Sequence, residues 1–145
     1  MKIALAQLNP VIGDLAGNSA KIVAAIQEAR QKGAGLVVLS ELVICGYPPR
    51  DLLLVQGFVE RCVAAVKVIG ETHTSGIAVV IGTPLNVDGG IANSVVVYED
   101  NALVGYHDKR LLPTYDVFDE DRYFEAGDRA VVVEVAGVRI GLAIC

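Results

Sequence analysis

Leu36-Val37-Val38-Leu39-Ser40-Glu41-Leu42 is the stretch that decides the fold, because a short apolar run ends there in a carboxylate. Residues 36–40 predict a buried β-strand, since the run is short, apolar and rich in branched side chains. Upstream, residues 2–8 predict a first strand, and Asn18 is predicted to cap a helix that ends at Gly33. Two strands joined through a helix form a parallel pair, so the N-terminal part is predicted to be α/β.

Downstream, the sequence repeats the order of helix and strand. Asp51 is predicted to cap a short helical stretch, and a longer helical pattern runs from Phe58 to about Gly70. Residues 77–81 then predict another buried strand.

Beyond this strand the helical spacing disappears and short strands alternate with turns. Asp88-Gly89 is a strong hairpin signal, and Asp100-Asn101 indicates a second turn. The strands on either side of these turns are therefore expected to be antiparallel. The predicted segments are strands at Thr83-Pro84, 91–98 and 102–107, a long polar loop at 108–128, and a hairpin of 130–135 and 138–144 around Ala136-Gly137.

Composition limits the classes of function. The 145 residues fit one domain, and 53% are hydrophobic, which indicates a large core. The formal net charge is −5 and no block of Lys or Arg occurs, which argues against binding to nucleic acid or to acidic membranes. No apolar run is long enough to span a bilayer.

The chain has three cysteines, Cys45, Cys62 and Cys145. Their number is odd and their spacing is wide, which predicts neither a disulfide framework nor a zinc site. This cysteine usage is typical of a reducing, cytoplasmic setting.

Three ionisable residues stand where predicted strands end. Glu41, Lys109 and Cys145 follow the strands at 36–40, 102–107 and 138–144. Ligand sites in α/β sheets gather at the carboxyl ends of strands. A thiolate nucleophile, a carboxylate that takes its proton and a cation that stabilises an oxyanion together suit acyl transfer from an amide.

Position in the sequence alone also allows a non-catalytic, structural role for each of these residues. Glu41 fits a solvated loop carboxylate, and Lys109 fits a surface ion-pair cluster with Asp108 and Arg110. Cys145 fits a small buried hydrophobic residue at a strand end.

Three stretches of sequence surround these residues. They are Ser40-Glu41-Leu42 with Cys45-Gly46-Tyr47-Pro48-Pro49-Arg50-Asp51-Leu52-Leu53, the run from Lys109 to Phe124, and Gly141-Leu142-Ala143-Ile144-Cys145. Together they resemble the signatures of the nitrilase (carbon-nitrogen hydrolase) superfamily. More narrowly, they are similar to the glutaminase domains of the glutamine-dependent NAD+ synthetase family, although Thr114 replaces the asparagine common there.

The resemblance implies a fold and a set of site residues. The fold is a four-layer α-β-β-α sandwich, of which this chain covers roughly the N-terminal half; residues 1–145 are expected to be the N-terminal part of the glutaminase domain, truncated at the nucleophile. Glu41 is implied as general base, Lys109 as oxyanion-stabilising cation and Cys145 as nucleophile. Tyr115 is expected to contact glutamine, or else to pack on its loop. Glu120 is expected to hold Lys109, or else to be one more charge in an acidic loop.

The resemblance also implies an activity. The domain would hydrolyse the side-chain amide of glutamine and supply ammonia for ATP-dependent NAD+ synthesis from nicotinic acid adenine dinucleotide. This half needs no metal or cofactor, whereas a C-terminal synthetase domain would use ATP and Mg²⁺. A cytoplasmic homo-oligomer is expected. A stand-alone amidase or carbamoylase remains an alternative, as does a catalytically inactive interaction subunit.

Overall fold

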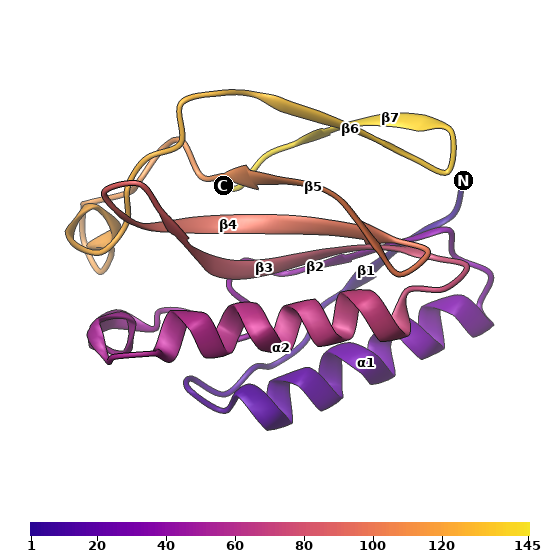
Figure 1. Ribbon diagram of the computed structural model, residues 1–145, viewed down its shortest axis with the longest axis horizontal. Helices are drawn as coiled ribbons and strands as arrows, with labels where there is room; N and C mark the ends of the chain where they lie inside the picture. The colour runs from indigo at the N-terminus through magenta and orange to yellow at the C-terminus, as the bar shows by residue number, and fades with distance from the viewer.

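The computed structural model describes residues 1–145 and forms an α/β sandwich (Figure 1). A layer of two helices covers one face of a five-stranded sheet, and a two-stranded hairpin lies on the other side (Figure 1). The predicted α/β class is confirmed, and these residues supply the first helical layer, the first sheet and two strands of a second sheet. The elements are β1 (Ile3–Ala6), α1 (Leu15–Gln31), β2 (Leu36–Leu39), the 3-10 helix η1 (Arg50–Leu54), α2 (Phe58–His73), β3 (Ala78–Val87), β4 (Gly90–Glu99), β5 (Ala102–Asp108), the 3-10 helix η2 (Glu120–Arg122), β6 (Val131–Val135) and β7 (Val138–Leu142).

The five-stranded sheet changes from parallel to antiparallel pairing, as the sequence predicted. Its order is β1-β2-β3-β4-β5; β1, β2 and β3 are parallel, and β3, β4 and β5 are antiparallel. Both predicted turns occur, with positive φ at Gly89, Asp100 and Asn101. The third strand is longer than predicted, because it pairs with β4 along its whole length to Val87.

The sheet separates two hydrophobic clusters, because successive side chains on a strand point to opposite faces. Val37, Val79 and Val96 face the helices and pack in the larger cluster with Ile22 and Ile26 of α1. The smaller cluster faces the hairpin and consists of Leu36, Ala78, Val80, Val95, Val97, Val133 and Val135.

Asn18 does not cap the first helix, which corrects the prediction. The cap is Asp14, whose Oδ1 accepts the N–H of Gly17 at 2.9 Å, and Asn18 lies buried in the first turn. The Asn18 amide instead donates to the carbonyls of Val11 (2.8 Å) and Ile44 (3.0 Å). It therefore ties the loop before α1 to the loop that follows Glu41.

Two other helix boundaries differ from prediction. No side chain caps η1, and Asp51 accepts a hydrogen bond from the Tyr123 hydroxyl at 2.6 Å instead. α2 continues past Gly70 to His73. Gly70 does not end this helix: a Cβ there would collide with the ring of Tyr98, so glycine is needed for close packing of α2 on β4.

None of the helices combines the length and the apolar composition that crossing a membrane would require.

Gly82 sets the position of the loop that carries Glu41. A Cβ at Gly82 would collide with the backbone of Ser40 and Leu42, so that loop lies directly on the β3 backbone. The Gly82 carbonyl also accepts the N–H of Ile44 at 3.4 Å. The absence of a side chain at Gly82 therefore allows Glu41 to lie beside the sheet.

We predict that Gly82→Ala lowers the free energy of unfolding of the full-length protein by about 1–3 kcal/mol, because the methyl group meets backbone that cannot rotate away. Urea denaturation measures this. Gly35→Ala is the matched control, since a Cβ at Gly35 meets only the flexible side chain of Met1, and it should stay within about 0.5 kcal/mol of the parent. Equal stabilities of the two variants would contradict the close approach.

Candidate active site

Glu41, Lys109 and Cys145 come together around one cavity. β2 and β5 run in the same direction, so the loops that follow them, with Glu41 and Lys109, leave the same edge of the sheet. The exposed Cys145 follows β7 and lines the same cavity, which has a volume of about 470 Å³. This volume is within the usual range for a small-molecule site. Its lining is Glu41, Tyr47, Lys109, Leu111, Leu112, Pro113, Thr114, Tyr115, Phe118, Glu120 and Cys145.

The Lys109 ammonium lies between two carboxylates. Its Nζ is 2.7 Å from Glu41 Oε1, and 3.0 Å and 2.9 Å from Glu120 Oε1 and Oε2. The side chains of Lys109 and Glu120 are only 2% and 4% exposed, whereas Glu41 is 24% exposed toward the cavity. The surface ion-pair interpretation of Lys109 is therefore wrong, and Glu120 is a buried partner of the ammonium.

The surroundings keep Lys109 charged. Burial alone would lower the pKa of the Lys109 ammonium, but the hydrogen bonds and charges of Glu41 and Glu120 outweigh burial and raise that pKa above its usual value. At neutral pH the site therefore holds a fixed cation whose counter-ions are both within hydrogen-bond distance.

Tyr47 is the second donor to Glu120. Its hydroxyl donates to Glu120 Oε1 at 2.7 Å. Burial, followed by the hydrogen bond to Glu120, raises the pKa of the Tyr47 hydroxyl, so it stays a neutral donor. Sequence reasoning included Tyr47 in a motif but gave it no role of its own.

Asn93 was missed by the sequence analysis altogether. Its Nδ2 donates to Glu41 Oε1 at 2.6 Å, and its side chain is fully buried in β4. A signal was present, because an asparagine inside an apolar strand is uncommon and a buried amide needs partners. The identity of that partner was not visible, since Glu41 lies 52 positions away.

Tyr115 lines the cavity and is 70% exposed. Its ring packs against Phe118 in an edge contact with centroids 5.7 Å apart. Both contact with a ligand and packing on its own loop fit this position. Cys45 and Cys62 are fully buried and lie outside the cavity lining, in agreement with structural roles.

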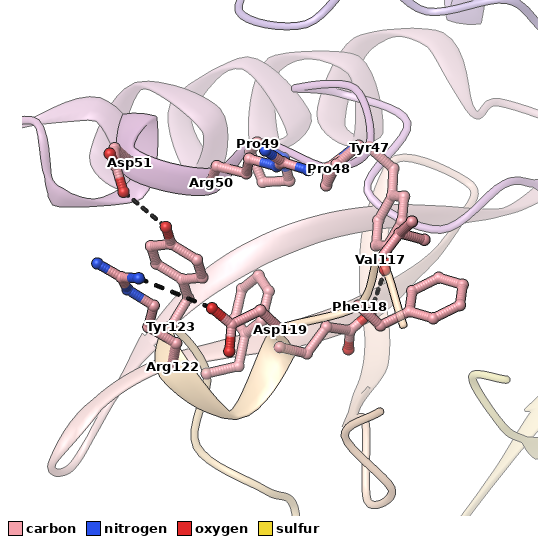
Figure 2. Close-up of a pocket in the computed structure, with 12 residues that line it drawn as sticks. Tyr47, Pro48, Pro49, Arg50, Asp51, Val117, Phe118, Asp119, Arg122 and Tyr123 are labelled. Atoms are coloured by element: carbon pink, nitrogen blue, oxygen red, sulfur yellow. Dashed lines mark hydrogen bonds and ion pairs between the residues drawn. The ribbon is translucent and has the colours of Figure 1, made fainter. Parts of the chain in front are cut away.

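A second pocket lies on the other side of a wall formed by Tyr47, Phe118 and Glu120, which line both spaces. Figure 2 shows this outer pocket, with the Tyr123 hydroxyl pointing to Asp51 across it. That bond joins the residue directly after η2 to η1, so the two loops that form the wall are held to each other.

No group of three or more His, Cys, Asp or Glu side chains is arranged as a metal-binding set. The cation between Glu41 and Glu120 is the Lys109 ammonium itself.

Comparison with known sequences identifies similar proteins. The sequence model of the carbon-nitrogen hydrolase family matches residues 2–145. A glutamine-dependent NAD(+) synthetase of Synechocystis sp. is 42% identical over 99% of this chain and 27% of its own length. The synthetase of Thermotoga maritima is 37% identical over 100% of this chain and 25% of its own length. The chain thus spans about a quarter of these relatives.

Solved structures agree with the fold. The glutamine-dependent NAD+ synthetase of Acinetobacter baumannii, in complex with ADP, superposes with a TM-score of 0.92 at 36% identity, over 99% of this chain and 27% of that one. An amidase from Nesterenkonia sp. superposes at 0.86 with 24% identity, over 100% of this chain and 55% of that one, which shows a shared fold.

We predict that Glu120→Gln destabilises the full-length protein by about 1–3 kcal/mol, because the buried Lys109 ammonium keeps Glu41 but loses the charge-assisted hydrogen bond to its second carboxylate. Urea denaturation at neutral pH measures this. Asp119→Asn is the matched control: its 3.8 Å pair with Arg122 is well exposed and should contribute at most about 1 kcal/mol. Equal losses in the two variants would refute the buried cluster.

We predict a pH-dependent effect of Tyr47→Phe. At neutral pH the substitution removes a hydrogen bond to a carboxylate and costs about 1.5–3 kcal/mol of unfolding free energy. Because the pKa of Tyr47 is raised on folding, the unfolded chain loses this proton first, from about pH 10. The stability difference between parent and variant should therefore shrink above about pH 10. A difference that stayed constant or grew, in urea denaturation at pH 8 and pH 10.5, would contradict this.

Proposed function

Since the chain belongs to the carbon-nitrogen hydrolase family, we propose that it is the N-terminal part of the glutamine-hydrolysing domain of a glutamine-dependent NAD+ synthetase. The observation that carries this proposal is the buried Glu41–Lys109–Glu120 cluster, which opens on a cavity that Cys145 also lines. A base, a cation and a thiol around one small-molecule cavity are the groups that amide hydrolysis through a thioester requires.

The first half of the reaction forms the thioester. Glu41 accepts the thiol proton of Cys145, and the sulfur adds to the side-chain carbonyl carbon of glutamine. The carbonyl oxygen becomes an oxyanion, which the Lys109 ammonium stabilises. As the C–N bond breaks, Glu41 returns the proton to the nitrogen and ammonia leaves.

The second half releases glutamate. Glu41 takes a proton from water, and the hydroxide adds to the thioester carbon. The tetrahedral intermediate collapses, the C–S bond breaks and the proton returns to sulfur. Glutamate leaves and the Cys145 thiol is restored, so no external reactant other than water is consumed.

Lys109 has the donors that this role requires. An ammonium group has three N–H donors, and Glu41 and Glu120 engage it from two sides. The remaining N–H is available to the oxyanion. Tyr47 strengthens the arrangement, because its hydrogen bond holds Glu120 in place.

The proposal extends to the whole protein. Ammonia from this domain would be used in ATP- and Mg²⁺-dependent synthesis of NAD+ from nicotinic acid adenine dinucleotide by a C-terminal synthetase domain. We place the enzyme in the cytoplasm as a homo-oligomer. Tyr115 is proposed to contact glutamine from the rim of the cavity, where its ring is exposed.

We predict that Cys145→Ala in the full-length protein abolishes ammonia release from glutamine, because the nucleophile is removed. NAD+ synthesis with added ammonium chloride should continue at the parental rate, since the synthetase reaction needs only free ammonia. A coupled glutamate dehydrogenase assay with glutamine, and an NAD+ assay with ammonium chloride, measure the two activities.

The outcomes separate the candidate functions. If Cys145→Ala released ammonia as fast as the parent, Cys145 would not be the nucleophile. A parent that hydrolysed other small amides, but not glutamine, would indicate a stand-alone amidase or carbamoylase. A parent inactive on every amide would indicate an interaction subunit.

A further inference from the structure

Asn93 of β4 is a buried polar side chain that the mechanism above does not use. It has no exposed surface, and the same strand contributes Val95 and Val97 to the smaller hydrophobic cluster. A buried amide costs free energy unless it is hydrogen-bonded. Its partners therefore indicate why an asparagine occupies this position.

Asn93 contacts both members of the ion pair. Its Nδ2 donates to Glu41 Oε1 at 2.6 Å, and its backbone carbonyl accepts the N–H of Lys109 at 2.8 Å. The orientation of the amide follows from chemistry, because an ionised carboxylate only accepts hydrogen bonds and must face the nitrogen. Asn93 thus holds both the side chain of Glu41 and the backbone of Lys109.

The two donors to Glu41 meet at the same oxygen. Asn93 Nδ2 and Lys109 Nζ donate to Oε1 at 2.6 Å and 2.7 Å, and both hydrogen bonds go to this oxygen. Two donors on Oε1 fix the plane of the carboxylate, and Oε2 keeps its lone pairs available for a proton.

We propose that Asn93 is a positioning residue for the base: by holding Oε1 together with Lys109, it makes Oε2 the oxygen of Glu41 that exchanges protons. This inference rests on the thiol chemistry proposed above. The S–H bond of Cys145 breaks and an O–H bond forms at Oε2, so the negative charge moves from the carboxylate to sulfur.

The other charged and titratable groups that face Glu41 are Lys109, Glu120, Tyr47 and Cys145. Lys109 already bonds Oε1, and Tyr47 donates to Glu120. Asn93 is therefore a neutral donor whose loss alters the alignment of Glu41 and leaves the formal charge of the site unchanged.

The test compares Asn93→Ala and Asn93→Asp with the parent in the full-length protein. The rate of Cys145 alkylation by iodoacetamide, followed by mass spectrometry, and kcat and KM for glutamine are measured across pH. In Asn93→Ala the acidic limb of both profiles should move to higher pH by about one unit, because ionised Glu41 loses a donor. In Asn93→Asp it should move further, since a second carboxylate then meets Oε1. The kcat should fall by about tenfold or more, with KM near the parental value.

Thr83→Val is the matched control. Thr83 is equally buried on the neighbouring strand, and its hydroxyl donates to the Pro84 carbonyl at 3.1 Å, away from the ion pair. This variant should keep the parental pH profile, and its melting temperature calibrates the cost of losing a buried polar group.

Unchanged kcat and pH limb in a folded Asn93→Ala protein would overturn the inference. So would a lower kcat and melting temperature with the limb at its parental pH, because Asn93 would then only support the fold. If the parent alkylates at Cys145 but does not hydrolyse glutamine, the proposed function fails, and the shift of the alkylation profile alone decides the role of Asn93.

Discussion

A lysine ammonium held between two carboxylates, almost out of contact with water, is the interaction on which the rest of this structure depends. Isolated ions are costly to bury, and their mutual attraction repays that cost only when geometry and additional hydrogen bonds are good. The surroundings of Lys109 meet this condition. Glu41 and Glu120 bracket the ammonium, Tyr47 donates to Glu120, and Asn93 donates to Glu41. The partners come from loops and strands that are far apart in the chain. The cluster therefore forms only when the chain is folded, and it holds these loops and strands together.

The change from parallel to antiparallel pairing is what makes this cluster possible. β2 and β5 are separated by two strands, yet they point the same way, and the loops with Glu41 and Lys109 therefore leave one edge of the sheet. β4 runs in the opposite direction between them, so its first half lies at that edge and brings Asn93 to the ion pair. Gly82 allows the loop after β2 to lie against the sheet. Local sequence thus supplies the groups, and topology brings them together.

The sequence predicted those features that depend on local interactions or on a periodic pattern of apolar residues. Apolar periodicity located the helices and strands, and Asp88-Gly89 and Asp100-Asn101 located both turns. The motifs directed attention to Glu41 and Lys109, although the burial of that pair was not readable from charge patterning. Predictions failed where tertiary contacts override local preference: Asn18 and Asp51 have the composition of helix caps, but distant backbone and a tyrosine hydroxyl engage them instead. Asn93 was missed for the same reason.

The charges of the cluster do not cancel. Glu41 and Glu120 contribute two negative charges and Lys109 one positive charge, so the base of the cavity has an excess of one negative charge. For the proposed reaction this excess distinguishes the two ends of the turnover. The amide group of glutamine is neutral and enters without repulsion, whereas the carboxylate formed from it meets a charge of its own sign. In the proposed reaction, the charges assigned to activating the thiol would therefore also favour release of glutamate and oppose inhibition by the product.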